Sequence, residues 1–137
     1  MADTTNAPVT YTEPHYVAAS QNGWGIEMIG TEAVDGSNLD HAGIIGLNMT
    51  DFKIECEGIR KARVRNRRGK WLPYKKNFVS LGDGTDITGI EIVGDGFIFS
   101  VHCKGGSWLA SKNTSNVEGE VLGGLGSPID AIWIEKI

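Results

Sequence analysis

The 137-residue sequence has no long hydrophobic run, only two cysteines and only four prolines. No apolar stretch approaches the roughly 20 residues that cross a bilayer, so we expect no membrane partner. The first residues lack the basic start, apolar run and small-residue cleavage site of a secretory signal, which predicts a chain that is cytoplasmic at synthesis. Cys56 and Cys103 would stay reduced there.

A helical period is also missing from the whole chain. The 19 glycines are spread along it, which indicates many turns and short strands rather than disorder. Residues 1–14 have no periodicity and hold two prolines, so we expect a flexible N-terminal arm. The remaining residues, 15–137, are predicted to form a single all-β domain.

One motif recurs three times in this domain. A tryptophan follows a glycine turn at Trp24, Trp71 and Trp108, and a valine lies seven residues before each one. Further along, residues 46–55, 84–93 and 126–135 match in register. Their shared columns are Gly46, Gly84 and Gly126; Met49, Ile87 and Ile129; and Thr50, Thr88 and Asp130. The pattern predicts three units of about 40 residues each, at 15–58, 59–96 and 97–137.

Each unit begins and ends with a strand pattern in which every second residue is apolar. Gly94, Asp95 and Gly96 join two such runs and predict a hairpin between the second and third units. We therefore predict a pseudo-threefold β-trefoil, whose barrel comes from the first and last strands of each unit. The alternative is a β-prism, in which each unit forms its own sheet.

The segments "VHCKGGSWLASKN" and "GLGSPIDAIWI" of the third unit resemble repeats at the ends of bacterial and phage cell-wall hydrolases. Those repeats have a Gly-Gly-Trp-Leu-Pro turn and a Pro-Ile-Asp-Ala-Ile strand, and they are similar to clostridial hydrophobic repeats with a glycine-tryptophan pair. "KWLPY" and "ITGIEI" carry the resemblance in the second unit, and "NGW" and "HAGIIG" in the first. The resemblance implies surface attachment or glycan binding, without catalysis.

The repeated tryptophans have two interpretations. They are core or cap residues of the three units, or they flank shallow grooves in which the apolar face of a sugar stacks. In the second case Tyr74 adds an aromatic wall and polar loop residues orient the sugar hydroxyls. The candidate ligand-binding residues are then Trp24, Trp71, Trp108, Tyr74, Asp40, Asn113 and Glu120.

Positive charge is concentrated in residues 60–76, which hold nine of the 13 Lys and Arg residues and no acid. Arg63, Arg65 and Arg67 alternate, so a strand would present them on one face about 6.8 Å apart. One interpretation is a strand face that is simply exposed to solvent. The sharper one is an anion-binding face for an anionic polymer or an acidic protein surface, which also allows self-association.

Signals for catalysis and metal binding are weak. His15, His41 and His102 occupy unmatched positions in the three units, and no spacing of ligands is typical of a metal site. We therefore predict a protein that is not an enzyme and that has no cofactor and no metal.

The predicted function is a lectin-like, non-catalytic module that binds a bacterial cell-wall glycan or another surface glycan polymer. Three repeats would make it multivalent. The alternative is a structural or interaction protein, such as a phage virion component or an assembly subunit. In either case the protein would act at a cell surface or in a virion after release.

Overall fold

The computed structural model describes residues 11–109, 112–113, 121–122 and 127–137. These residues form strands, turns and loops without any helix, which confirms the predicted all-β class, and so none of their segments is a helix that could cross a membrane. The strands are β1 (His15–Ser20), β2 (Gly23–Trp24), β3 (Met28–Ile29), β4 (Glu32–Ala33), β5 (Ala42–Gly43), β6 (Asp51–Glu55), β7 (Ile59–Arg65), β8 (Gly89–Gly94), β9 (Phe97–Cys103), β10 (Lys112–Asn113), β11 (Val121–Leu122) and β12 (Ile129–Lys136).

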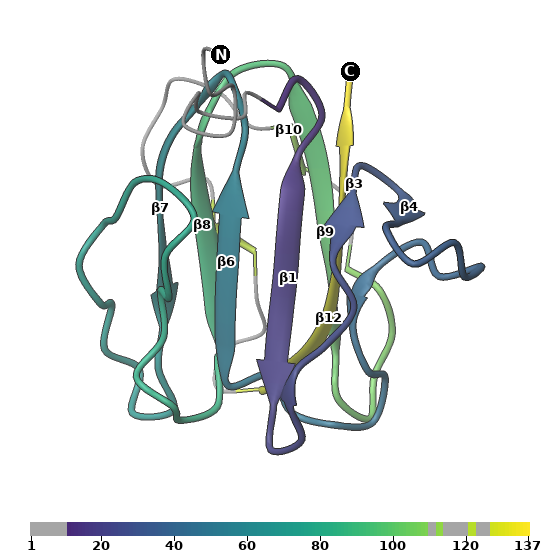
Figure 1. The fold of residues 1–137 in the computed structure, drawn as a ribbon. Helices are drawn as coiled ribbons and strands as arrows, with labels where there is room; N and C mark the ends of the chain where they lie inside the picture. Colours follow the sequence, from purple (N-terminus) through teal and green to yellow (C-terminus); the bar gives the residue numbers. More distant parts are fainter. Residues whose placement is uncertain (1–10, 110–111, 114–120, 123–126) are drawn as a thin grey trace, which may run out of the picture.

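The six long strands form three antiparallel pairs, each in a different sheet (Figure 1). β1 pairs with β6, β7 with β8, and β9 with β12. In each pair the two strands come from the beginning and the end of one predicted unit. Alternating apolar residues build these strands, because a strand with one face on a core must bury every second side chain.

The hairpin predicted at Gly94, Asp95 and Gly96 does not form. β8 and β9 lie in different sheets, and no ladder joins them in the described part of the chain. Ile59 lies opposite Gly94, and the amide of Asp95 donates to the carbonyl of Gly58 at 3.1 Å. The amide of Asp95 therefore binds the residue before β7, and the chain passes from one sheet into the next.

Short segments of one predicted unit complete the sheet of another. β5 of the first unit pairs with β12, and β11 of the third unit pairs with β8. In the second unit, the amide of Leu81 donates to the carbonyl of Phe52 in β6 at 3.0 Å. Each long pair thus receives an edge segment from a different unit, in a cyclic order.

The chain also closes on itself through a ring of three backbone hydrogen bonds. The amide of Met49 donates to the carbonyl of Ile129, Ile129 donates to Ile87, and Ile87 donates to Met49, each at 2.8 Å. All three side chains are buried. They are the residues that share one column of the repeat in the sequence.

A single core lies between the inward faces of the three pairs. Ala18 lies opposite Phe52 in the first pair, as Val64 lies opposite Ile90 and Val101 opposite Ile132. Val17, the valine seven residues before Trp24, does not share this position and is one residue out of phase: it lies opposite Lys53 on the other face of β1, where it is buried outside the core cluster.

The shift arises in the turn before each tryptophan. Trp24 pairs with Ala19, five residues earlier, whereas Trp71 and Trp108 pair with Arg65 and His102, six residues earlier. The first turn is one residue shorter, so the strand before it moves by one residue, and a shift of one exchanges the two faces of a strand.

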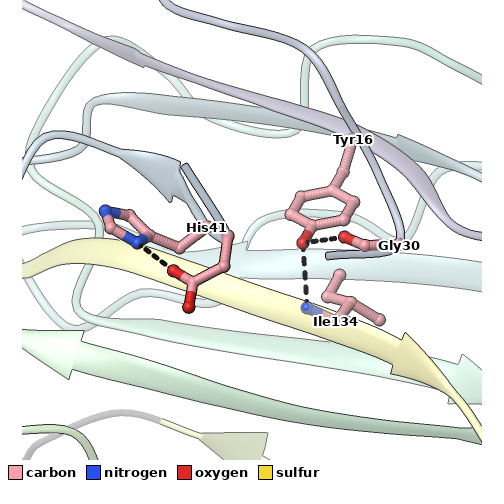
Figure 2. A network of polar contacts seen from close by, with 5 residues as sticks. Tyr16, Gly30, His41 and Ile134 are labelled. Carbon is pink, nitrogen blue, oxygen red and sulfur yellow. Dashed lines mark hydrogen bonds and ion pairs between the residues drawn. The ribbon is translucent and has the colours of Figure 1, made fainter. Parts of the chain in front are cut away.

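Tyr16 connects β1 to the opposite side of the core (Figure 2). Its hydroxyl donates to the carbonyl of Gly30 at 2.6 Å and accepts from the amide of Ile134 in β12 at 3.0 Å. Burial raises the pKa of Tyr16 well above its usual range. The neutral hydroxyl therefore holds two sheets and the turn after β3 together.

Of the predicted N-terminal arm, residues 1–10 lie outside the described residues. Tyr11 packs against the domain: its ring stacks on His15 with centroids 4.3 Å apart, and its carbonyl accepts from the amide of Glu57 at 2.7 Å. Phe78 stacks on the other face of His15, also at 4.3 Å.

Candidate binding surfaces

The three repeated tryptophans occupy the same position in their hairpins. Each pairs with a residue near the end of the first long strand of its unit: Ala19, Arg65 or His102. The core cluster of the described residues contains none of the three indoles. Trp24 is the most open, with 44% of its surface exposed, and the other two are half-buried.

Cationic side chains cover the aromatic rings of the second unit. The guanidinium carbon of Arg63 lies 4.7 Å from the ring centre of Trp71 and 4.3 Å from that of Tyr74. Lys61 places its ammonium 4.1 Å from the centre of Tyr74, and Arg65 lies 5.6 Å from Trp71. A sugar could reach these ring faces only by displacing a cation–π contact.

The same arginines hold groups of the protein itself. Arg63 donates from Nε to Glu91 Oε1 at 3.0 Å and lies 2.9 Å from it through Nη2. Glu91 is fully buried, and its second oxygen accepts from the hydroxyl of Tyr74. Arg65 donates to the side chain and to the carbonyl of Thr88 at 3.1 and 2.7 Å.

The three arginines of the predicted anion-binding face therefore have different surroundings. Arg63 and Arg65 stabilise the outer face of their own sheet, whereas Arg67 lies exposed in the turn after β7. The backbone amide of Arg67 donates to Thr85 at 3.4 Å. The structure does not assemble the three guanidinium groups into one row of equivalent cations.

Trp108 lies between two histidines that each contact a carboxylate. The rings of His41 and His102 meet it edge-on, with centroids 5.6 and 5.3 Å away. His102 Nδ1 lies 2.6 Å from the fully buried Asp130, and His41 Nδ1 lies 2.9 Å from Asp40 (Figure 2). Among the described residues, no three His, Cys, Asp or Glu side chains come together as metal ligands.

Beside Trp24 lies a small pocket of about 90 Å³, which we call the Trp24 pocket. Gly23 and Gly25, the neighbours of Trp24 in the chain, line it, although Trp24 itself does not, and six further lining residues come from the segment between Leu39 and Met49. Most of the lining is apolar, with Ser20, His41 and Asp130 as the polar contributors. An apolar pocket with a few polar groups is typical of a small-ligand site.

The part of the chain that contributes most of this pocket also exposes apolar side chains. Six of the eight large apolar side chains that are exposed in the described residues fall between positions 24 and 45: Trp24, Ile26, Ile29, Val34, Ile44 and Ile45. Exposed apolar surface in one region of a soluble domain indicates an interaction site rather than a random distribution.

The remaining predicted residues are only partly placed. Asp40 is exposed and contacts His41. The backbone of Asn113 pairs with Ile98, while its side chain, like all of Glu120, lies outside the described residues. Sequence reasoning missed Glu91 as a binding partner. The alignment of the three units placed Asp130 and Thr88 at equivalent positions, but it did not reveal that they bind His102 and Arg65.

No protein-family model, curated protein or solved structure matches this chain.

Proposed function

We propose that this protein is a non-catalytic, lectin-like module that binds a bacterial cell-wall glycan or another surface glycan polymer at the Trp24 pocket. The observation that carries the proposal is a mostly apolar pocket with Ser20, His41 and Asp130 in its lining, formed in part by the two chain neighbours of the exposed Trp24. A sugar ring combines an apolar face of C–H groups with hydroxyls at its edge, and this surface offers both kinds of partner.

Each part of the site has a role in this proposal. Lys53 places its ammonium 4.3 Å from the ring centre of Trp24 and so occupies part of one ring face. The area of the indole that stays exposed, 44% of the residue, packs against the C–H face. Ile44, half-exposed at the pocket, adds apolar contact. Ser20 and His41 supply hydrogen bonds to hydroxyls.

The surroundings of the three indoles favour one site for each chain instead of three. Trp71 is covered by arginine, and Trp108 lies against two imidazole rings, so neither offers the same open surface as Trp24. Binding to a polymer would then gain avidity from several chains, not from three sites in one chain.

The test is binding to an array of glycans and to isolated wall polysaccharide. Trp24→Ala and Ile44→Asp should each weaken binding at least about tenfold, which corresponds to roughly 1.4 kcal/mol. Ile45→Asp is the matched control, because Ile45 is as exposed as Ile44, at 51% against 50%, and does not line the pocket. Absence of glycan binding by the folded wild-type protein, or equal loss in both isoleucine variants, would contradict the proposal.

For the architecture, we propose a pseudo-threefold β-prism in place of the closed trefoil barrel. The strand pairs support it, because the outer strands of each predicted unit pair with each other, and in the described residues no ladder joins β6 to β7 or β8 to β9. The ring through Met49, Ile87 and Ile129 supports an approximate threefold axis. An experimental structure in which ladders link all six long strands would favour the trefoil.

A second candidate function is that of a structural or interaction protein, such as a virion component or an assembly subunit. The exposed apolar side chains between positions 24 and 45 favour it. Sedimentation at low and high salt separates the two functions. A stable oligomer that Ile44→Asp and Ile45→Asp both disrupt supports assembly, and a monomer under all conditions contradicts it.

A further inference from the structure

The basic segment 60–76 contains a second group of cationic residues, which line a pocket and of which Lys61 also contacts an aromatic ring of the outer face. Arg60, Lys61, Lys75 and Lys76 line one pocket of about 150 Å³, which we call the basic pocket. Arg60, Lys75 and Lys76 are exposed. Arg63 and Arg65, by contrast, lie outside this lining and bind Glu91 and Thr88.

Backbone pairing brings the two halves of this group together. Ala62 and Lys75 exchange two hydrogen bonds, at 3.1 and 3.0 Å, so the segment after Tyr74 lies along β7. Asn77 then turns the chain with a positive φ of 68°, and the ammonium of Lys75 donates to the carbonyl of Ser80 at 2.9 Å. Residues about 15 apart in the chain are therefore held around one cavity by the fold.

Cationic residues outnumber acidic ones in the lining of the basic pocket. Four lining residues are cationic and one, Glu55, carries a carboxylate. Glu55 also faces the imidazole of His15, with Oε2 3.4 Å from Nδ1. Cations gathered around a concave surface repel one another and raise the local potential, so an anion entering the pocket is stabilised.

We propose that the basic pocket binds a phosphate group of a phosphodiester polymer that carries no aromatic bases. Lysine ammonium and arginine guanidinium groups both make charge-assisted hydrogen bonds to phosphate oxygens. A polymer with bases would need an open aromatic face for stacking, and the nearest ring, Tyr74, has Lys61 and Arg63 over it. The basic pocket shares no lining residue with the Trp24 pocket, so this is a second, independent site.

The test measures binding of a poly(glycerol phosphate) chain by calorimetry over a range of salt concentrations. The double variant Arg60→Ala/Lys76→Ala removes two exposed cations of the pocket. Arg67→Ala/Arg68→Ala is the control, because it removes the same charge from exposed residues of the same segment outside the pocket. We expect about tenfold weaker binding and a salt slope lower by about one to two for the pocket variant, and a loss within about twofold for the control.

Cys56 gives a second readout, because its side chain lines the basic pocket. Saturating polymer should slow the alkylation of Cys56 by iodoacetamide in the wild type and not in the pocket variant. Ile44→Asp in the Trp24 pocket should leave polymer binding unchanged.

Several results would overturn the proposal. These are no polymer binding by the wild type, equal loss in the two charge-matched variants, and unchanged alkylation while polymer is bound. Tighter binding of single-stranded DNA than of poly(glycerol phosphate) at the same residues would overturn the assignment to a polymer without bases.

Discussion

Glu91 is a carboxylate with no exposure to solvent, yet it lies on the outer face of its sheet. Arg63 and Tyr74 satisfy its oxygens, and the guanidinium of Arg63 in turn lies over the ring of Trp71. A buried charge without such partners would be strongly unfavourable. The cation–π stack of the second unit is therefore a structural device that covers one buried acid.

This arrangement predicts the effect of neutralising Glu91. Glu91→Gln removes the charge that Arg63 faces and should lower the free energy of unfolding by about 3 kcal/mol. Glu57→Gln is the control, because Glu57 is exposed. Urea unfolding monitored by tryptophan fluorescence measures both variants, and equal midpoints for the two would show that the pair does not stabilise the fold.

Tyr16 gives a second prediction for a single residue. Tyr16→Phe removes one hydroxyl and leaves the carbonyl of Gly30 and the amide of Ile134 without their partner. Buried groups left unsatisfied cost about 1–3 kcal/mol, so the urea midpoint should fall accordingly. Tyr11→Phe, which changes the tyrosine stacked on His15, should change the midpoint far less.

Cys56 predicts a dependence on pH. Burial raises the pKa of this thiol to about 11, so the neutral form persists through neutral pH. Its pKa is higher than the value of about 8.5 in an unfolded chain, so the stability it contributes is present below that value and is lost as the pH rises toward 11. The alkylation rate of Cys56 in the native protein should therefore reach half its maximum near pH 11, and half-maximal alkylation near pH 8.5 would contradict this.

At the scale of elements, the all-β class and most of the long strands could be predicted from the sequence, because the alternation of apolar and polar residues is a local pattern. The register of β1 could not be predicted, because it depends on a turn that is one residue shorter than the turns of the other two units. "NGW" and "RGKW" both show a glycine before a tryptophan, and neither shows how many residues the turn holds.

The partners of the arginines could not be predicted from the sequence for a related reason. Alternation placed Arg63 and Arg65 on one face, and the structure has them there. Their partners Glu91 and Thr88 lie on the paired strand or next to it, 28 and 23 residues away, so only the register of the β7–β8 ladder reveals them. The basic pocket was missed in the same way, because it requires the bridge from Ala62 to Lys75.

The edge segment β5 allows a sharp test of the contacts between units. Gly43 has a φ of 93°, and a Cβ atom there would overlap the carbonyl oxygen of Asp130. Gly84 has a similar φ of 88° with open space around it. Gly84→Ala should cost about 1–2 kcal/mol for the backbone conformation alone, and Gly43→Ala about 1–3 kcal/mol more because of the overlap.

Thermal or urea unfolding of the two alanine variants measures this difference. Equal destabilisation by both substitutions would mean that β5 is not closely packed against β12. A loss confined to Gly43→Ala would mean that the positive φ itself costs little.

At the scale of the whole molecule, the exchange of edge segments makes the three strand pairs dependent on one another. β5 completes the sheet of β12, β11 completes that of β8, and Leu81 binds the edge of β6. No pair keeps its full set of partners if another unfolds. This predicts one cooperative transition, with equal calorimetric and van't Hoff enthalpies. Two or three resolved transitions in a calorimetric scan would contradict it.

The two proposed sites lie on separate parts of the molecule and have different chemistry. The Trp24 pocket is mostly apolar, and the basic pocket is cationic. A polymer that contains both sugars and phosphodiesters could occupy both at once, and linking two weak contacts raises the overall affinity.

The ring through Met49, Ile87 and Ile129 also constrains when the chain can fold during its synthesis. A ribosome releases these residues in order. The amide of Met49 and the carbonyl of Ile87 therefore cannot form these hydrogen bonds until Ile129 has left the exit tunnel. Contacts between residues so distant in the chain form slowly, because a long loop must close first. The nascent chain would thus emerge through most of its length with unpaired strand edges, and we expect it to depend on chaperones until the last strand arrives.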